Sequence, residues 1–265
     1  MMKLQPRQRH VEISTKDQYP NGLIHILSVT NSISITDDNF FRCLTDLNYS
    51  LMSLEECQLH RCNQMSAVFV MRSRGSQALP YLHILQATCL KKLVSLIEPS
   101  DVSHSRFLTL KLLKHIHIED CPRLEKLFPC SLSLSALETL VVLFCSNMKT
   151  IFYKQPNYEV ALSPLPNIKF INFQELPHLH HIQDDVKFQF ETPKLEKLFV
   201  RGCRSFQRLP LLKKEYLESK VEVSGEREWW DRLQLKLPEQ SDYYLHVPPP
   251  EFVSRKKRII QSYLK

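Results

Sequence analysis

Three short stretches of the sequence combine histidine, cysteine and carboxylate side chains, which are the side chains that bind metal ions. Zinc needs three or four such ligands that converge with good geometry. None of the three stretches offers a full set at a familiar metal-binding spacing, so we expect no metal and no cofactor. The residues concerned are Glu55, Glu56, Cys57, His60, Arg61 and Cys62, then His115, His117, Glu119 and Asp120, then His178, His180 and His181.

Catalytic signatures are equally sparse. The sequence contains no G-x-S-x-G, no H-E-x-x-H and no cysteine–histidine nucleophile pattern. The four glycines, Gly22, Gly75, Gly202 and Gly225, are too far apart to build a phosphate-binding loop. Nothing positive therefore points to an enzyme.

The spacing of apolar residues explains where these polar side chains lie. Between Leu113 and Leu127 the apolar residues fall at offsets 0, 3, 5, 8, 11 and 14. A helix repeats about every 3.6 residues and a strand about every 2, so neither element alone produces this spacing. It indicates a short strand followed by a chain that turns back onto the same core. This is the leucine-rich-repeat phrase L-x-x-L-x-L-x-x-C-x-x-L.

The same template fits six times along the chain. The copies begin at Leu54, Leu82, Leu113, Leu137, Ile168 and Leu195. A weaker copy begins at Ile24 and continues through Leu27, Val29, Ser32 and Ile35. Stacked copies share one core, and each strand extends a parallel sheet. We predict an α/β solenoid, an irregular leucine-rich-repeat horseshoe with a concave parallel sheet and a C-terminal cap.

The template also accounts for the cysteines without a catalytic or metal-binding role. Cys57 lies at offset 3, and offset 8, where a small inward side chain suits the corner, is occupied by Cys62, Cys121, Cys145 and Cys203. We interpret these thiols as core residues. His178 and His181 flank the inward Leu179 and Ile182, which favours a solvated turn over a metal site.

The chain divides into four predicted regions. Residues 1–20 form a poorly ordered lead-in with a short strand near His10, and residues 21–210 form about seven repeats, the first degenerate. Residues 211–240 form a cap, because an open solenoid end exposes apolar core. Within this cap Trp229 and Leu233 would share one face of a short helix. Residues 241–265 form a proline-rich and basic tail.

Charge and composition suggest an intracellular protein. Apolar residues make up 43% of the chain, and the formal net charge is +7, of which +4 lies in the last fifteen residues. The basic balance is therefore largely a property of the tail and does not indicate a nucleic-acid surface. The sequence shows no signal peptide or membrane span, so we expect reduced cysteines and a cytoplasmic protein. We interpret Arg255–Arg258 as part of a solvated tail, with nuclear targeting as the alternative.

Three phrases resemble a known family: LKHIHIEDCPRLEKLFP, ALETLVVLFCSNMKTIF and KLEKLFVRGCRSFQRLP. They are similar to the leucine-rich repeats of coiled-coil, nucleotide-binding plant disease resistance receptors, and Cys121–Phe128 resembles their C-terminal region in grasses. The resemblance covers roughly residues 20–265. It implies a sensing or autoinhibitory module whose partner is a pathogen effector, a guarded host protein or the receptor's nucleotide-binding switch module.

Two alternatives stay open beside this interpretation. The chain lacks the phosphate-binding loop of those receptors, which is compatible with a fragment or a truncated receptor without activity of its own. The second alternative is a substrate adaptor of a ubiquitin ligase. Such adaptors usually carry an F-box before the repeats, and residues 1–23 are too short for one.

A partner would contact the outward residues of the sheet, at offsets 2, 4, 6 and 7. They are polar in the middle of the chain and apolar one copy later. Neighbouring strands lie about 4.8 Å apart, so we expect the apolar side chains to touch and to form an interface. A cap folded over them, or a local slip of register, would explain them equally well. The predicted partner-binding residues are His115, His117, Glu119, Asp120, Val141, Leu143, Phe144, Phe170 and Phe199.

Overall fold

The fold is taken from a computed structural model of the chain. It describes residues 9–14, 19, 22–44, 47, 51–70, 79–98, 110–154, 165–183, 192–210, 212, 220–234 and 241–249. The predicted basic run at Arg255–Arg258 lies outside the described residues.

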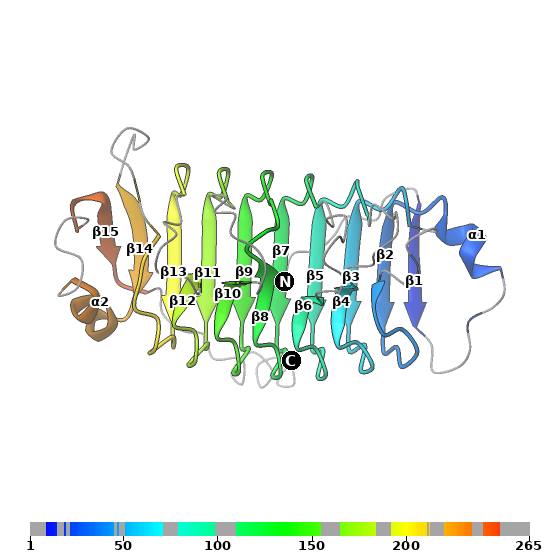
Figure 1. Ribbon diagram of the computed structural model, residues 1–265, viewed down its shortest axis with the longest axis horizontal. Helices are drawn as coiled ribbons and strands as arrows, with labels where there is room; N and C mark the ends of the chain where they lie inside the picture. The colour runs from blue at the N-terminus through cyan, green and yellow to red at the C-terminus, as the bar shows by residue number, and fades with distance from the viewer. Residues whose placement is uncertain are drawn as a thin grey trace, which may run out of the picture.

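Ten parallel strands form one continuous sheet along the long axis of the molecule (Figure 1). Consecutive strands pair in register, so equivalent template positions lie side by side; Ile116 pairs with Leu140, and Leu140 pairs with Ile171. This arrangement confirms the predicted solenoid with a parallel sheet. In order, the strands are β1 (His10–Ser14), β2 (Ser32–Thr36), β3 (Glu56–His60), β5 (Ile84–Thr88), β7 (His115–Glu119), β9 (Thr139–Leu143), β11 (Phe170–Gln174), β13 (Lys197–Arg201), β14 (Val221–Gly225) and β15 (Tyr244–Val247).

A second parallel sheet of five strands runs along the return path of the repeats. Each of its strands contains the residue at offset 14, such as Leu127 in β8. The sequence template located this inward residue but not the strand around it. The five strands are β4 (Ala67–Val70), β6 (Ser95–Glu98), β8 (Lys126–Pro129), β10 (Thr150–Tyr153) and β12 (His181–Gln183).

The core lies between the two sheets and is built from the template residues. In all six clear copies these residues are buried, apart from Leu209 in the last copy, which is partly buried. The thiols of Cys57, Cys62, Cys121, Cys145 and Cys203 are buried among them. Burying one leucine or isoleucine side chain contributes about 1.5–3 kcal/mol. The repeated ladder is therefore the main source of stability.

The strands β2, β3, β5, β7, β9, β11 and β13 each end in a left-handed turn at offset 7. In the first six of these turns the backbone N–H donates to a carbonyl of the next copy; Asp120 donates to Leu143 at 3.0 Å and Phe144 donates to Gln174 at 2.8 Å. In the last turn Gly202 donates to the carboxylate of Glu226 at 2.8 Å. Only one of the seven residues at these turns is glycine, although the left-handed region favours glycine. The seven residues are Asp37, Arg61, Cys89, Asp120, Phe144, Glu175 and Gly202, with φ between 53° and 64°.

The register predicted for the weak first copy is wrong. Ile24 and Val29 are more than half exposed, because they lie on or beside the short helix α1 (Leu23–Leu27). The first copy instead begins at Thr30 and places Ile33 and Ile35 in the core. The apolar residues of helix α1 have nearly the spacing of the first template positions, so the template was fitted to the helix and not to the strand that follows it.

The first copy also departs from the others at the corner that cysteine usually occupies. Asp38 takes that position and is fully buried, and its carboxylate accepts hydrogen bonds from the backbone N–H groups of Phe40 and Phe41. The lead-in contributes β1, which pairs with β2 in parallel, where the sequence had suggested a short strand.

The C-terminal end combines further strands with helix α2 (Arg227–Gln234). Strand β14 continues the sheet, and Gly225 takes the inward position that Val200 holds on β13. A Cβ atom at Gly225 would lie 2.6 Å from the indole ring of Trp229. The Trp229 ring thus fills the place of the missing ladder residue. Trp229 and Leu233 are both buried, as predicted for one face of a short helix.

Two more contacts hold this end together and join it to the last repeat. Trp230 stacks on His246 with ring centroids 4.9 Å apart. The hydroxyl of Tyr244 donates to the carbonyl of Pro210. A short 3-10 helix, η3 (Ser241–Tyr243), leads directly into β15.

Candidate functional site

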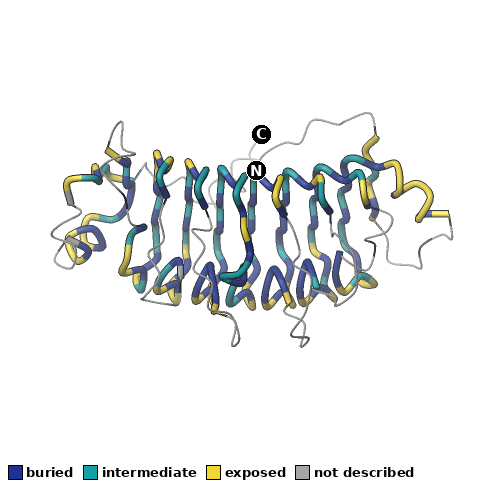
Figure 2. Tube along the Cα trace, turned by 45° about the horizontal axis from the view of Figure 1, so that its top comes forward, coloured by how far each residue is buried: buried dark blue, intermediate teal, exposed yellow. Residues whose placement is uncertain are grey.

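We call the outward residues of the ten-stranded sheet the outer face. On β7, β9 and β11 these residues are partly exposed and alternate with buried ones. The alternation follows from the two-residue period of a strand. Figure 2 shows it as buried and intermediate segments along the strands. Of the predicted partner-binding residues, seven lie on the outer face: His115, His117, Glu119, Val141, Leu143, Phe170 and Phe199.

The outward residues of β3, β5 and β7, which we call the polar zone, interact across the strands. Gln58 donates to Gln86 at 3.4 Å, and the Nδ1 atom of His60 lies 2.7 Å from the Thr88 hydroxyl. On β7 the Nε2 atom of His117 lies 3.2 Å from a carboxylate oxygen of Glu119. These contacts hold the polar side chains in defined positions, which lowers the entropy cost of binding a partner.

Two histidines of the polar zone favour their neutral form. Burial lowers the pKa of His115 below its ordinary value, while Glu138 opposes this shift. Burial also lowers the pKa of His60, and the charge of Arg61 acts in the same direction. A neutral imidazole offers one donor and one acceptor, so these side chains suit hydrogen bonding at neutral pH.

The apolar residues among the outward positions of β9, β11 and β13, together with Phe144, form what we call the apolar zone. Its Val141, Leu143, Phe170 and Phe199 are all partly exposed. The expectation that all the apolar side chains touch is not met by the register. Asn172 on β11 pairs with both Val141 and Phe199, and so lies between them. Phe170 is diagonal to each of these two residues, which leaves a cluster interrupted by one amide.

Phe144 and Asp120 occupy the left-handed turns at the end of the outer face. Phe144 has a φ of 55° and Asp120 a φ of 58°. Aspartate tolerates this conformation, whereas a bulky side chain is a genuine outlier there, at a cost of about 1–2 kcal/mol. Arg61, Cys89 and Glu175 take the same conformation in other copies, so this turn is a feature of the repeat. The case for Phe144 as a contact residue therefore rests on its place beside the apolar outward residues of β9 and β11.

Charge is scarce in the middle of the outer face. Of the twelve outward residues on β5, β7, β9 and β11, only Glu119 carries a formal charge. Charged residues make up 24% of the chain, so about three would be expected among twelve. Charged pairs flank this centre, such as Lys169 with Glu138 at 3.1 Å. An uncharged centre with aromatic residues inside a charged rim is the usual anatomy of a protein interface.

Some residues of this surface were not singled out from the sequence. Asn172 and Gln174 lie at offsets 4 and 6 of their copy, and Gln86 and Thr88 hold the same offsets on β5. The template already identified these offsets as outward, so it contained the signal that would have found them. Only the register shows which of these residues are neighbours.

The candidate metal ligands do not converge in the described part of the chain, where no group of three histidine, cysteine, aspartate or glutamate side chains could hold a metal ion. Burial raises the pKa of Cys62 to about 12 and also raises that of Cys57. Both thiols are therefore inert. His178 is exposed on a turn beside the buried Leu179, as the template predicted, whereas His181 is the first residue of β12 and only partly exposed.

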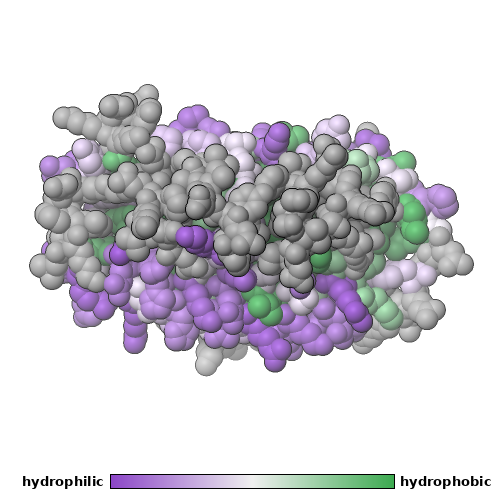
Figure 3. Space-filling model, viewed as in Figure 1, coloured by the Kyte–Doolittle hydropathy of each residue, from purple (hydrophilic) through white to green (hydrophobic). Residues whose placement is uncertain are grey.

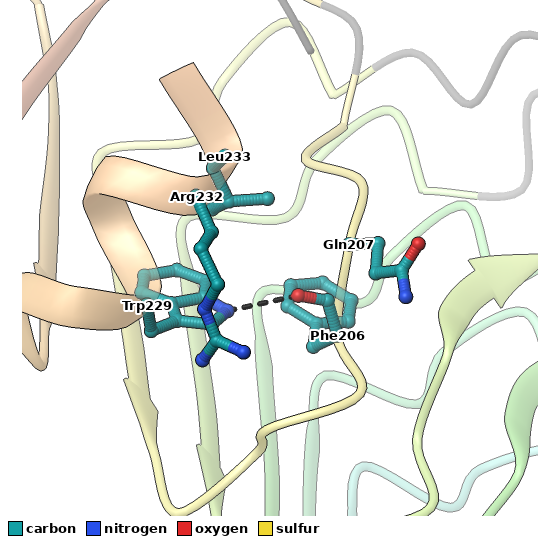
Figure 4. Close-up of a pocket in the computed structure, with 5 residues that line it drawn as sticks. All are labelled: Phe206, Gln207, Trp229, Arg232 and Leu233. Carbon is teal, nitrogen blue, oxygen red and sulfur yellow. Dashed lines mark hydrogen bonds between the residues drawn. The ribbon is translucent and has the colours of Figure 1, made fainter. Parts of the chain in front are cut away.

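A small cavity of about 60 Å³ opens between α2 and the last repeat (Figure 4). Its walls include Arg232 and Leu233 from the helix and Gln207 from the repeat. The indole N–H of Trp229 donates to the carbonyl of Phe206 at 2.9 Å, which closes its inner side. Ligand pockets usually measure about 300–1,000 Å³. This cavity is too small for a cofactor, so the outer face is the stronger candidate site.

The comparisons with known proteins agree with the repeat architecture. Residues 24–135 match the family model described as plant disease resistance protein RPS2-like, leucine-rich repeats. This part of the chain is therefore similar to the leucine-rich repeats of plant disease resistance proteins. A search of curated proteins found no match to the chain. Solenoids of this kind are typically binding scaffolds without catalytic activity. No helix in the described part of the chain is both long enough and apolar enough to cross a membrane.

Proposed function

We propose that this chain is a non-catalytic protein-binding module of a plant immune receptor of the coiled-coil, nucleotide-binding class. The observation that carries the proposal is the outer face of β5 to β13, where a partly aromatic centre with a single formal charge, at Glu119, lies inside a charged rim. The family match of residues 24–135 supports a role in defence. The partner is a pathogen effector, a guarded host protein or the receptor's own switch module.

The proposed mechanism is recognition by a preformed surface. The polar zone presents hydrogen-bonding groups that cross-strand contacts already orient, such as His60 and Gln58. The apolar zone presents Phe144, Phe170 and Phe199, and aromatic side chains are common energetic anchors of interfaces. Binding would bury the aromatic rings and leave the charged rim in solvent.

We further propose that the protein acts in the cytoplasm. All eight cysteines are free; six of them are buried and two are partly buried. Free thiols of this number are usual in a reducing compartment. Localisation of a fluorescent fusion in plant cells tests this part, and variants of Arg255–Arg258 test whether the basic run directs the protein to the nucleus.

The main experiment is affinity purification of the tagged chain from plant tissue. We expect a nucleotide-binding immune protein or a defence-related host protein to be retained by the wild-type chain. Phe144→Asp with Phe199→Asp should abolish this retention, because the two carboxylates would be desolvated in the interface. Ile26→Asp is the matched control, since Ile26 is 53% exposed on α1, away from the outer face.

Two outcomes would contradict the proposal. Retention of a ubiquitin-ligase scaffold would favour the substrate-adaptor function instead. Loss of the folded state in the Phe144 and Phe199 variants, measured by circular dichroism and thermal unfolding, would show that the apolar zone is core and not a contact surface.

A further inference from the structure

The two long edges of the solenoid carry different charges. We call the turns that follow the outer-face strands the turn edge, and the segments that precede these strands the lead edge. The turn edge comprises residues 63–67, 91–95, 122–126, 146–150, 177–181 and 204–208. The lead edge comprises residues 52–55, 80–83, 111–114, 135–138, 166–169 and 193–196.

The turn edge is strongly basic. It holds seven lysines and arginines and a single acid, Glu125, for a formal charge of +6. The lead edge holds four lysines and three glutamates, for a formal charge of +1. The seven cations of the turn edge are Lys91, Lys92, Arg123, Lys126, Lys149, Arg204 and Arg208. The excess charge of the repeats is therefore concentrated on one side of the molecule.

Most of these cations are available to a partner. All seven are exposed except Lys126, which is partly buried and lies over the ring of Tyr153 at 4.4 Å. Lys149 pairs with Glu125 at 3.0 Å. In contrast, Arg123 and Arg204 form no ion pair with any described residue. Figure 2 shows exposed segments at the lower turns, and the lower margin in Figure 3 is largely hydrophilic.

The lead edge neutralises its own charges. Lys169 pairs with Glu138 at 3.1 Å, which lowers the pKa of that carboxyl. Asn31 donates to the carboxylate of Glu55 at 2.8 Å. Because acids and lysines alternate along this edge, its field is weak at a distance, whereas the like charges of the turn edge add together.

We propose that the turn edge is a docking surface for an acidic segment of a partner protein. The cations lie in the copies of β5, β7, β9 and β13, which together span four strand spacings or about 19 Å; the copy of β11 between them contributes histidines and no lysine or arginine. An extended acidic segment of about six residues spans this length. This surface is distinct from the outer face, so the inference goes beyond the proposed function.

The side chains beside the cations favour a polypeptide over other anionic partners. Binding of a single-stranded nucleic acid relies on aromatic side chains that stack on bases, and the turn edge exposes no phenylalanine, tyrosine or tryptophan. Docking on a membrane combines charge with apolar side chains that insert, and Val94 is the one large apolar side chain exposed on this edge. An acidic segment needs neither feature.

Binding of a fluorescent oligoglutamate peptide, measured by anisotropy at low and at physiological salt, tests the proposal. We expect saturable binding that weakens with salt, because exposed charges are screened. The variant K91E/K92E/R123E should bind about tenfold more weakly or not at all. The variant K111E/K114E/K194E is the matched control: it makes the same change of net charge on exposed residues of the lead edge, and should retain binding within about twofold.

The remaining outcomes would overturn the proposal. An absence of peptide binding, or an equal loss in both triple variants, would show that no localised acidic-segment site exists. Tighter binding to phosphatidylserine vesicles or to a single-stranded oligonucleotide than to the peptide would assign the edge to a different partner. The Phe144 and Phe199 variants should bind the peptide normally, so failure here is distinguishable from failure of the proposed function.

Discussion

On β7, two faces of one strand illustrate two different constraints. Ile116 and Ile118 point into the core and are at most 1% exposed, while His115, His117 and Glu119 point outward and are partly exposed. Every copy repeats the inward pair as apolar residues, because each must pack against the copies on either side. The outward residues change from copy to copy. The inward face stabilises the stack, and the outward face is free to vary with the partner.

The largest expected contrast between the faces is in stability. Ile118→Ala removes a fully buried side chain from the middle of the ladder and should lower the free energy of unfolding by about 2–5 kcal/mol. His117→Ala, one residue earlier on the outer face, should change it by less than about 1 kcal/mol. Urea denaturation followed by circular dichroism measures both variants.

Similar losses of unfolding free energy in the two variants would contradict this expectation, because they would mean that the outer face also stabilises the stack.

The same contrast explains how much of the structure the sequence predicted. The ladder was predictable because a residue such as Ile118 has one requirement, which is to be apolar and inward. The second sheet was missed since its strands contribute only one template residue each, such as Leu127 in β8. The register predicted from Ile24 was wrong because the apolar residues of α1 match the spacing of the template over a few residues.

The candidate site was only partly predictable. The offsets identified which residues point outward, and the structure places His117, Val141 and Phe199 there. The position of Asn172 between Val141 and Phe199 depends on pairing between strands of different copies. The strain at Phe144 depends on a turn conformation that leaves no mark on the apolar spacing.

A smaller effect on stability is expected at the strained turn of the outer face. Phe144→Gly removes the strain of a bulky residue at a φ of 55°, worth about 1–2 kcal/mol, but adds flexibility to the unfolded chain and loses the contacts of the ring. These terms oppose each other, so the free energy of unfolding should change by less than about 1 kcal/mol. Partner binding should nevertheless be lost.

Glu175→Gly provides the control for the Phe144 variant. It introduces glycine at the same turn one copy later, where the side chain is exposed and is not a predicted partner-binding residue. It should leave partner binding largely unchanged. A loss of more than about 3 kcal/mol in Phe144→Gly would instead identify the ring as part of the core.

The smallest expected effect concerns the pH dependence of stability between about pH 7.5 and 6.0, where the outer face contributes and the thiols of the ladder stay protonated. Burial lowers the pKa of His115 and His60 in the folded state, while the unfolded chain titrates near the ordinary histidine pKa of about 6.5. Just below that pH the unfolded state binds more protons, so the free energy of unfolding falls as the pH is lowered. His115→Gln with His60→Gln should reduce the fall between about pH 7.5 and 6.0, measured by urea denaturation at each pH. His178→Gln, on an exposed turn, should leave it unchanged. An identical fall in all three proteins would show that these two outward histidines are not coupled to folding.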